Sequence, residues 1–320
     1  MNNAIFNFEQ PKNEPVKTYV PGSSDRKALN EALDKLSSQV IDIPLIIGGK
    51  EIRTGKTGKV TMPHNHNHIL ATYHKAGEKE VKMAIESSLE AHKKWEATSW
   101  VERLSITLKA AELISKKYRY LLNAATMLGQ GKNAYQAEID AACETIDFLR
   151  FNAHYISEIY NEQPHSEPGI VNRIEYRPLE GFVFSITPFN FTAIASNLNL
   201  APILMGNTVV WKPATTSLLS NYLLMQIYKE AGLHDGVLNF IPGQGSLIGN
   251  IVLKHPDLAG VHFTGSSSTF NQIWKTVSEN IGKFKSYPKL VGETGGKDFI
   301  FVHKSANPLE VATAIVRGAF

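Results

Sequence analysis

Five short apolar runs in the second half of the chain constrain the fold more than any other feature of the sequence. Between the first four runs lie stretches with helical periodicity, such as LLSNYLLMQIYKEAGL and FNQIWKTVSENI. Strands that are apolar along their whole length and alternate with helices are typical of a parallel sheet covered by helices on both faces. We therefore predict an α/β fold with a doubly wound, Rossmann-like parallel sheet. Its strands are expected at residues 181–187, 208–212, 237–241, 260–264 and 298–302.

The first half of the chain is predicted to form an N-terminal arm and a helical layer. The arm covers residues 1–42 and includes a short amphipathic helix over 27–36. A hairpin follows over 43–52, because the Gly-Gly pair at 48 and 49 suits a tight turn between two apolar runs. Helical spacing of apolar residues then predicts three longer helices. They are expected near 81–89, near 104–111 with a capping box of Ser99 and Glu102, and over 134–159.

Composition and charge exclude several classes of protein. The net charge of +3 is small and the lysines are scattered, so a nucleic-acid partner is not expected. No apolar run reaches the length of a membrane span. The first residues lack the pattern of a secretory or transit peptide, which favours the cytoplasm; a mature protein of the mitochondrial matrix is the alternative. A single cysteine fits a reducing compartment.

Three weaker motifs favour structural interpretations. His64, His66 and His68 alternate, but without a Cys or carboxylate at metal spacing we expect an exposed loop and no metal site. Cys143 lies among small and apolar residues in a helical stretch, which predicts a buried structural thiol rather than a nucleophile. The Gly129–Gly131 segment follows a helix instead of a strand, so we expect a helix terminus and turn.

The predicted strand ends carry the residues that suit chemistry, because ligands of parallel sheets bind beyond the carboxyl ends of the strands. Asn190 follows the first of these strands, where its amide could donate to a developing oxyanion. Capping of the next helix is an equal alternative for Asn190 alone. Lys212 ends the second strand and suits a ribose hydroxyl or phosphate, although a solvated lysine is also possible.

Two glycine-containing segments complete this set. Gly265 leads from a strand into a helix, whose free N–H groups and dipole make an anion site. Glu293 lies in Gly292-Glu-Thr-Gly-Gly-Lys297, where a carboxylate could act as a general base toward water.

The motifs TPFNF, WKPA, FTGS and GETGGK occur in this order and at a spacing that resembles the aldehyde dehydrogenase superfamily. The resemblance covers nearly the whole chain from about residue 43. Within the superfamily the chain is most similar to the glutamate-semialdehyde (pyrroline-5-carboxylate) dehydrogenases. That finer resemblance rests on residues 129–132, 136–140, 147–152, 177–182 and 292–298.

The resemblance implies a role for individual residues. Asn190 would be the oxyanion donor and Glu293 the general base that activates water. Lys212 would contact the adenosine ribose, and Thr187 would lie beside the substrate. Glu138 would lie near the nitrogen end of the substrate. Further cofactor contacts are implied at Ile186, Pro188, Gly265, Ser266, Ser267, Ser268 and Thr269.

For the whole protein the resemblance implies NAD-dependent oxidation of L-glutamate γ-semialdehyde to L-glutamate in proline catabolism. The family reaction proceeds through a thioester on a cysteine. That cysteine, the substrate-carboxylate anchor loop and the oligomerisation tail are expected beyond residue 320, so these residues alone should be inactive. Alternatives are a dehydrogenase for another small semialdehyde, such as succinate semialdehyde, and a non-catalytic NAD-binding or assembly fragment. Thr215 stands where many relatives carry a Glu, which leaves NAD or NADP preference open.

The implied organisation has three parts. Residues 1–42 form the arm, 43–292 the NAD-binding domain and 293–320 the start of a truncated catalytic domain. An extended strand near 170–178, including 173–176, is expected to leave the nucleotide domain and to serve a homodimer or higher homo-oligomer.

Overall fold

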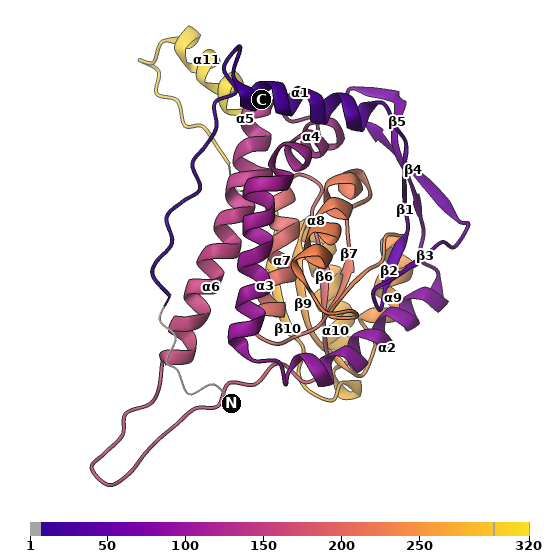
Figure 1. The fold of residues 1–320 in the computed structure, drawn as a ribbon, viewed down its shortest axis with the longest axis vertical. Helices are drawn as coiled ribbons and strands as arrows, with labels where there is room; N and C mark the ends of the chain where they lie inside the picture. The colour runs from indigo at the N-terminus through magenta and orange to yellow at the C-terminus, as the bar shows by residue number, and fades with distance from the viewer. Residues whose placement is uncertain (1–7, 297, 320) are drawn as a thin grey trace.

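The computed structural model describes residues 8–296 and 298–319, and over these residues its centre is a seven-stranded sheet (Figure 1). The strand order is β10-β9-β6-β7-β8-β2-β3, with parallel pairing from β10 through β8. The predicted parallel sheet is therefore confirmed. The parallel strands are β6 (Phe182–Ile186), β7 (Val209–Lys212), β8 (Leu238–Phe240), β9 (Leu258–Thr264) and β10 (Lys289–Glu293).

The predicted hairpin is also confirmed and extends the same sheet. It consists of β2 (Leu45–Ile47) and β3 (Lys50–Ile52), with Gly48 and Gly49 both at positive φ in the turn. Strand β2 pairs antiparallel with β8. The sheet thus acquires an antiparallel edge that the sequence pattern did not predict.

Burial on both faces explains the continuous apolar character of the strands. Val183 packs in one core cluster with α7 (Thr192–Leu204) and α8 (Leu218–Ala231), whereas Phe182 and Phe184 pack in the other. In β7, Trp211 belongs to the first cluster and Val210 to the second. The second cluster includes residues of α2 (Glu78–Trp95), α9 (Gly245–Val252) and α10 (Ser267–Glu279).

A helical layer covers α7 and α8 on the outside of the molecule (Figure 1). Its members are α3 (Trp100–Leu113), η1 (Ile114–Tyr118), α4 (Arg119–Gln130), α5 (Ala134–Ala137), η2 (Glu138–Glu144) and α6 (Thr145–Asn161). Ser99 caps α3 by accepting from the amide of Glu102 at 3.2 Å, which is the first half of the predicted capping box. The Glu102 carboxylate lies 3.7 Å from His234 Nε2 instead of at the Ser99 amide. The stretch predicted over 134–159 is helical throughout, but η2 within it is π-helical. The predicted turn also holds, since α4 ends at the left-handed Gly131.

The N-terminal segment contributes α1 (Ser24–Ser37) and a second sheet. This sheet has the order β1-β5-β4, formed by β1 (Ile41–Ile43), β4 (Thr57–Met62) and β5 (Asn65–His74). The loop predicted for the three histidines is therefore wrong in part. His64 lies in a turn, but His66 and His68 belong to β5, because the hairpin continues through this polar stretch.

The strand predicted over residues 298–302 is wrong. These residues have no strand pairing, and Phe299 and Phe301 are 85% and 88% exposed. The edge strand of the sheet is instead β10, which pairs with β9 in parallel. Apolar composition alone does not show whether a neighbouring strand is present. Beyond this segment, α11 (Pro308–Ala319) stands away from the sheet in Figure 1.

Residues 162–178 form a long excursion at the lower left of Figure 1. Residues 170–178 make no backbone ladder within this chain, and the extended strand expected there for a homo-oligomer stays a prediction. Side chains hold the two halves together instead: the Ile174 amide donates to Gln163 at 2.9 Å, and Tyr176 donates to the carbonyl of Glu162 at 3.0 Å. Ile170 and Val171 at its outer part are exposed.

Candidate active site

The strand order places a switch point between β6 and β9. The chain passes from β6 to β7 and β8 on one side, then returns to β9 on the other side of β6. Ligands of such sheets bind outside the carboxyl ends of the strands at this point. Ile186 is in register with Phe263, and Thr264 with Glu293. The segments after β6 and β9 and the end of β10 therefore meet at one edge.

A pocket of about 540 Å³ opens at this edge and is lined by both residues predicted to be catalytic. Asn190 and Glu293 line it together with Thr187, Pro188 and Gly265. Other lining residues include Ser266 and Thr269. Residues from three separate segments of the chain, after β6, after β9 and at the end of β10, are thus brought into one concave site.

Asn190 is exposed, and its side chain has no hydrogen-bond partner among the described residues. Helix α7 begins at Thr192, and its N-cap residue is Phe191. The first amides of α7 donate to the carboxylate of Asp140 instead. The alternative that Asn190 caps this helix is therefore not supported, and its carboxamide remains free to donate to a ligand.

Glu293 is the last residue of β10 and points its carboxylate toward the end of β9. Thr264 Oγ1 donates to Glu293 Oε2 at 3.2 Å, and the Gly265 amide donates to the Glu293 carbonyl at 3.1 Å. The side chain is otherwise exposed. One carboxylate oxygen thus remains available to accept a proton from water in the pocket.

A second pocket, of about 570 Å³, adjoins the first and shares Thr269 with it. It is lined by Lys212, Ile186 and Ser268. Burial lowers the pKa of the Lys212 amine. Among residues 8–296 and 298–319, Lys212 has no ion-pair partner. A half-buried cation without a partner suits an anionic or hydroxyl-bearing ligand.

The turn from β9 into α10 joins the two pockets. Ser266 caps α10 by accepting from the Thr269 amide at 3.2 Å, so Ser267 and Ser268 begin the helix. A Cβ on Gly265 would lie 2.7 Å from the Phe263 ring, so only glycine fits there. Phe263 stacks on Phe270 with ring centroids 5.6 Å apart. The anion site predicted from the sequence would lie at this helix N-terminus.

Thr187 is buried at the base of the first pocket. Its hydroxyl accepts a hydrogen bond of 2.9 Å from Trp211 Nε1. Trp211 is itself fully buried in β7. The sheet core therefore fixes the side chain that was predicted to lie beside the substrate.

Glu138 lines neither pocket, so its contacts do not support the predicted place beside the substrate. Its carboxylate is 0% exposed and pairs with Arg119. It also accepts from Tyr19 Oη at 2.5 Å, Asn123 Nδ2 at 2.8 Å and the Lys17 amide at 2.9 Å. Every lone pair has a local partner, so Glu138 fastens the N-terminal arm to the helical layer.

Cys143 is buried beside this cluster, as predicted. Burial and the neighbouring Glu138 carboxylate raise the pKa of its thiol to about 12. It lines neither of the two pockets at the strand ends. A thiol that stays protonated and lies away from the site does not serve as a nucleophile.

Two further residues line pockets at this edge and were not predicted from the sequence. Gly245 begins α9 after β8 and lies against the Lys212 side chain in the second pocket. Because Gly245 follows strand β8, the rule that ligands bind beyond strand ends could have identified it, as it identified Lys212. Glu144 lines a pocket of about 280 Å³ together with Glu293. Burial, and then the negative charge of Asp140, raise the pKa of Glu144 to about 7, a signal that only the fold reveals.

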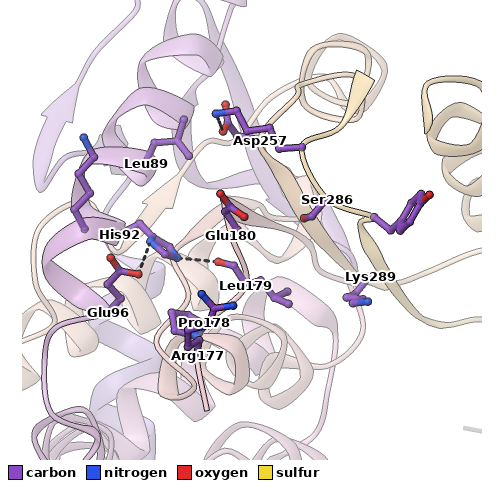
Figure 2. A pocket seen from close by; sticks show the side chains of 14 residues that line it. Leu89, His92, Glu96, Arg177, Pro178, Leu179, Glu180, Asp257, Ser286 and Lys289 are labelled. Atoms are coloured by element: carbon purple, nitrogen blue, oxygen red, sulfur yellow. Dashed lines mark hydrogen bonds and ion pairs between the residues drawn. The ribbon is translucent and has the colours of Figure 1, made fainter. Parts of the chain in front are cut away.

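A larger cavity, of about 900 Å³, opens at the amino ends of the strands (Figure 2). There His92 bonds to the Leu179 carbonyl at 2.9 Å, and Lys285 pairs with Asp257. None of the predicted site residues lines this cavity. Four lysine or arginine side chains and three carboxylates line this cavity, which lies at the edge of the sheet opposite to the predicted site.

No group of three or more His, Cys, Asp or Glu side chains in the described part of the chain is arranged to hold a metal. No helix there combines the length and apolar character needed to cross a membrane.

Comparison with known proteins agrees with this geometry. The Aldehyde dehydrogenase family profile matches residues 52–320. The chain belongs to the aldehyde dehydrogenase family. It is 52% identical to a probable delta-1-pyrroline-5-carboxylate dehydrogenase of Schizosaccharomyces pombe, over 99% of this chain and 59% of that protein. It is 45% identical to the mitochondrial delta-1-pyrroline-5-carboxylate dehydrogenase of Homo sapiens, over 96% of this chain and 55% of that protein.

A solved structure is similar over the whole chain. The delta-pyrroline-5-carboxylate dehydrogenase of Mycobacterium tuberculosis, in a crystal structure bound with NAD, matches with a TM-score of 0.96 and 48% sequence identity. The match covers 100% of this chain and 60% of that chain. The chain thus spans less than two thirds of the length of these relatives.

Proposed function

We propose that this chain is the NAD-binding part of an enzyme that oxidises L-glutamate γ-semialdehyde, formed from pyrroline-5-carboxylate, to L-glutamate in proline catabolism. The names of the relatives from Schizosaccharomyces pombe and Homo sapiens support this substrate. The observation that carries the proposal is the meeting of Asn190 and Glu293 in one pocket. That pocket adjoins a second one that contains an unpaired lysine.

The residues that line the second pocket suit the ribose and pyrophosphate groups of NAD. Lys212 would hold a ribose hydroxyl, and the α10 N-terminus with Ser266 to Thr269 would hold the pyrophosphate. Gly265 keeps the turn before this helix compatible with the Phe263 ring, because a Cβ there would lie 2.7 Å from it. Ile186 and Pro188 would pack where the two pockets adjoin. NAD supplies a hydride acceptor when bound.

Within the reaction, the chain's own residues act on charge and protons. A thiolate attacks the aldehyde carbon, a C–S bond forms, and the carbonyl oxygen becomes an oxyanion. Asn190 Nδ2 donates to this oxyanion. Loss of a hydride from the adduct, for which bound NAD would supply the acceptor, leaves a thioester, and Glu293 then takes a proton from the attacking water. The C–S bond then breaks, and the acid and the thiol are released.

We propose that the nucleophilic cysteine is supplied from outside residues 1–320. Cys143 is the single cysteine of the chain, and burial keeps its thiol protonated. The 320 residues alone should then bind NAD without turnover. The exposed apolar residues of the 162–178 excursion support a role in a homo-oligomer. A reducing compartment, the cytoplasm or the mitochondrial matrix, suits a protein that depends on a free thiol.

The test compares substrates with the intact dehydrogenase. Its kcat/KM should be higher for glutamate semialdehyde than for succinate semialdehyde, measured by NADH formation. A preference for succinate semialdehyde would replace the substrate and keep the enzyme class. NAD binding by the 320 residues, combined with no aldehyde oxidation by the intact protein, would favour the non-catalytic fragment.

A further inference from the structure

The segment that carries Asn190 is fixed at both ends by different elements. Thr187 and Pro188, on one side, are buried at the end of β6. Helix α7 begins on the other side, two residues after Asn190. Asn190 makes no side-chain hydrogen bond within the described residues, so the backbone between these anchors determines where its carboxamide lies.

Asp140 provides the anchor at the α7 end. Its Oδ1 accepts from the Ala193 amide at 2.9 Å, and its Oδ2 accepts from the Thr192 amide at 3.1 Å. Asp140 is 1% exposed and comes from η2, 52 positions earlier in the chain. A helix ordinarily receives its cap from an adjacent residue. Here the positive end of the helix is held by a carboxylate from another element.

Lys132 connects this carboxylate to the residue beside Asn190. Its Nζ lies 2.7 Å from Asp140 Oδ2 and 4.0 Å from the centroid of the Phe191 ring. One ammonium group thus contacts the cap and the aromatic residue that follows Asn190. The 16% exposure of Lys132 places this cation–aromatic contact at a largely desolvated site, where such contacts are stronger.

We infer that Asp140, together with Lys132, is a positioning residue that sets the location of the Asn190 carboxamide. This inference rests on the proposed oxyanion role of Asn190. The fold does not depend on Asp140 alone, because Thr192 Oγ1 also accepts from Gln130 Nε2 at 2.8 Å. Loss of Asp140 should therefore loosen the first turn of α7 and move Asn190 without removing the helix.

The test uses the intact dehydrogenase and the variants Asp140→Asn, Asn190→Ala and the double variant. Asn at position 140 accepts only one of the two amides and no longer pairs with Lys132. We expect kcat and the rate of the NADH burst to fall roughly 10- to 100-fold, since small misplacements of a reacting group have effects of this size. The KM for the aldehyde should stay nearly constant. The double variant should be no slower than Asn190→Ala, because residues that act as a unit are not additive.

Ser99→Ala is the matched control, because it removes another helix cap, far from the pocket, and should leave kcat unchanged. If Asp140→Asn does not fold, Lys132→Met is measured with the same readouts and the same expected direction. A normal kcat in a folded Asp140→Asn variant would overturn this inference but not the proposed function. The same holds if the losses of kcat in the two single variants multiply in the double variant. A normal burst in Asn190→Ala would overturn the proposed site as well.

Discussion

The polar residues at the carboxyl edge of the sheet differ from those beneath the N-terminal arm in how many hydrogen-bond and ion-pair partners the chain provides for them. Lys212 and Asn190 line pockets and lack partners among the described residues. Glu138 and Arg119 are buried and paired with each other. The cluster continues through Glu14, which pairs with Arg119 and Arg150 at 2.6 Å each.

The difference teaches which of these residues are available for function. A buried charge is tolerated when it is paired, and its partners then leave it nothing for a ligand. A partly buried cation without a partner is costly until a ligand arrives. Both groups combine carboxylates, cations and amides, so residue type alone does not distinguish them.

Breaking the buried cluster should have the largest effect on stability. Glu138→Ala leaves Arg119 buried without its main partner, and loss of one member of a buried pair costs about 3–5 kcal/mol. We expect a drop of this size in the free energy of unfolding, measured by urea denaturation. NAD affinity of the folded fraction should not change. A stable variant with altered substrate KM would instead return Glu138 to the substrate site.

Replacing the unpaired lysine should lower ligand affinity rather than stability. Lys212→Met should weaken NAD binding by about 1.5–3 kcal/mol, as expected for a lost hydrogen bond from a charged group. The NAD-free protein should become slightly more stable, because a desolvated charge is removed. Calorimetric titration and thermal melts check the two parts. Unchanged NAD affinity would mean that Lys212 does not contact the nucleotide.

Glu144 lies between the two regions and should show a smaller, pH-dependent effect. Burial raises the pKa of its carboxyl from 4.5 in the unfolded chain to about 7 in the fold. The folded chain therefore keeps a proton that the unfolded chain loses, so stability from this group is present below about pH 4.5 and is lost as the pH rises to about 7. Glu144→Gln should stabilise the protein by roughly 1 kcal/mol at pH 8, after allowance for partial exposure. Melts at pH 4 should show no gain; an equal gain at both pH values would contradict the shift.

The sequence was sufficient for elements whose pattern reflects their own burial. The strands β6 to β9 are apolar because both faces pack, and the helices near them keep their spacing. Strand β10 was not predicted, because it is a mostly exposed edge strand without a continuous apolar run. Residues 298–302 were wrongly predicted as a strand, because they are apolar but have no strand beside them.

The site was predictable where it depended on strand ends and not where it depended on distant partners. Asn190 follows β6 and Lys212 ends β7, so the predicted topology brings both to one edge. Glu293 ends β10, which was not predicted, and was found from its glycine-containing segment instead. The burial of Glu138 depends on Tyr19 and Arg119, which lie 119 and 19 positions away. No local pattern shows that these side chains close around it.

The central claim is that the carboxyl edge holds the chemistry, with Asn190 acting before Glu293. Stopped-flow measurement of NADH formation by the intact dehydrogenase, at matched folded concentration, tests it most directly. Asn190→Ala should slow the burst itself by about 10²–10³, because it removes an oxyanion donor. Glu293→Gln should keep a burst and then turn over slowly, because water attack on the thioester is impaired. Near-normal burst and turnover in both variants would contradict the account.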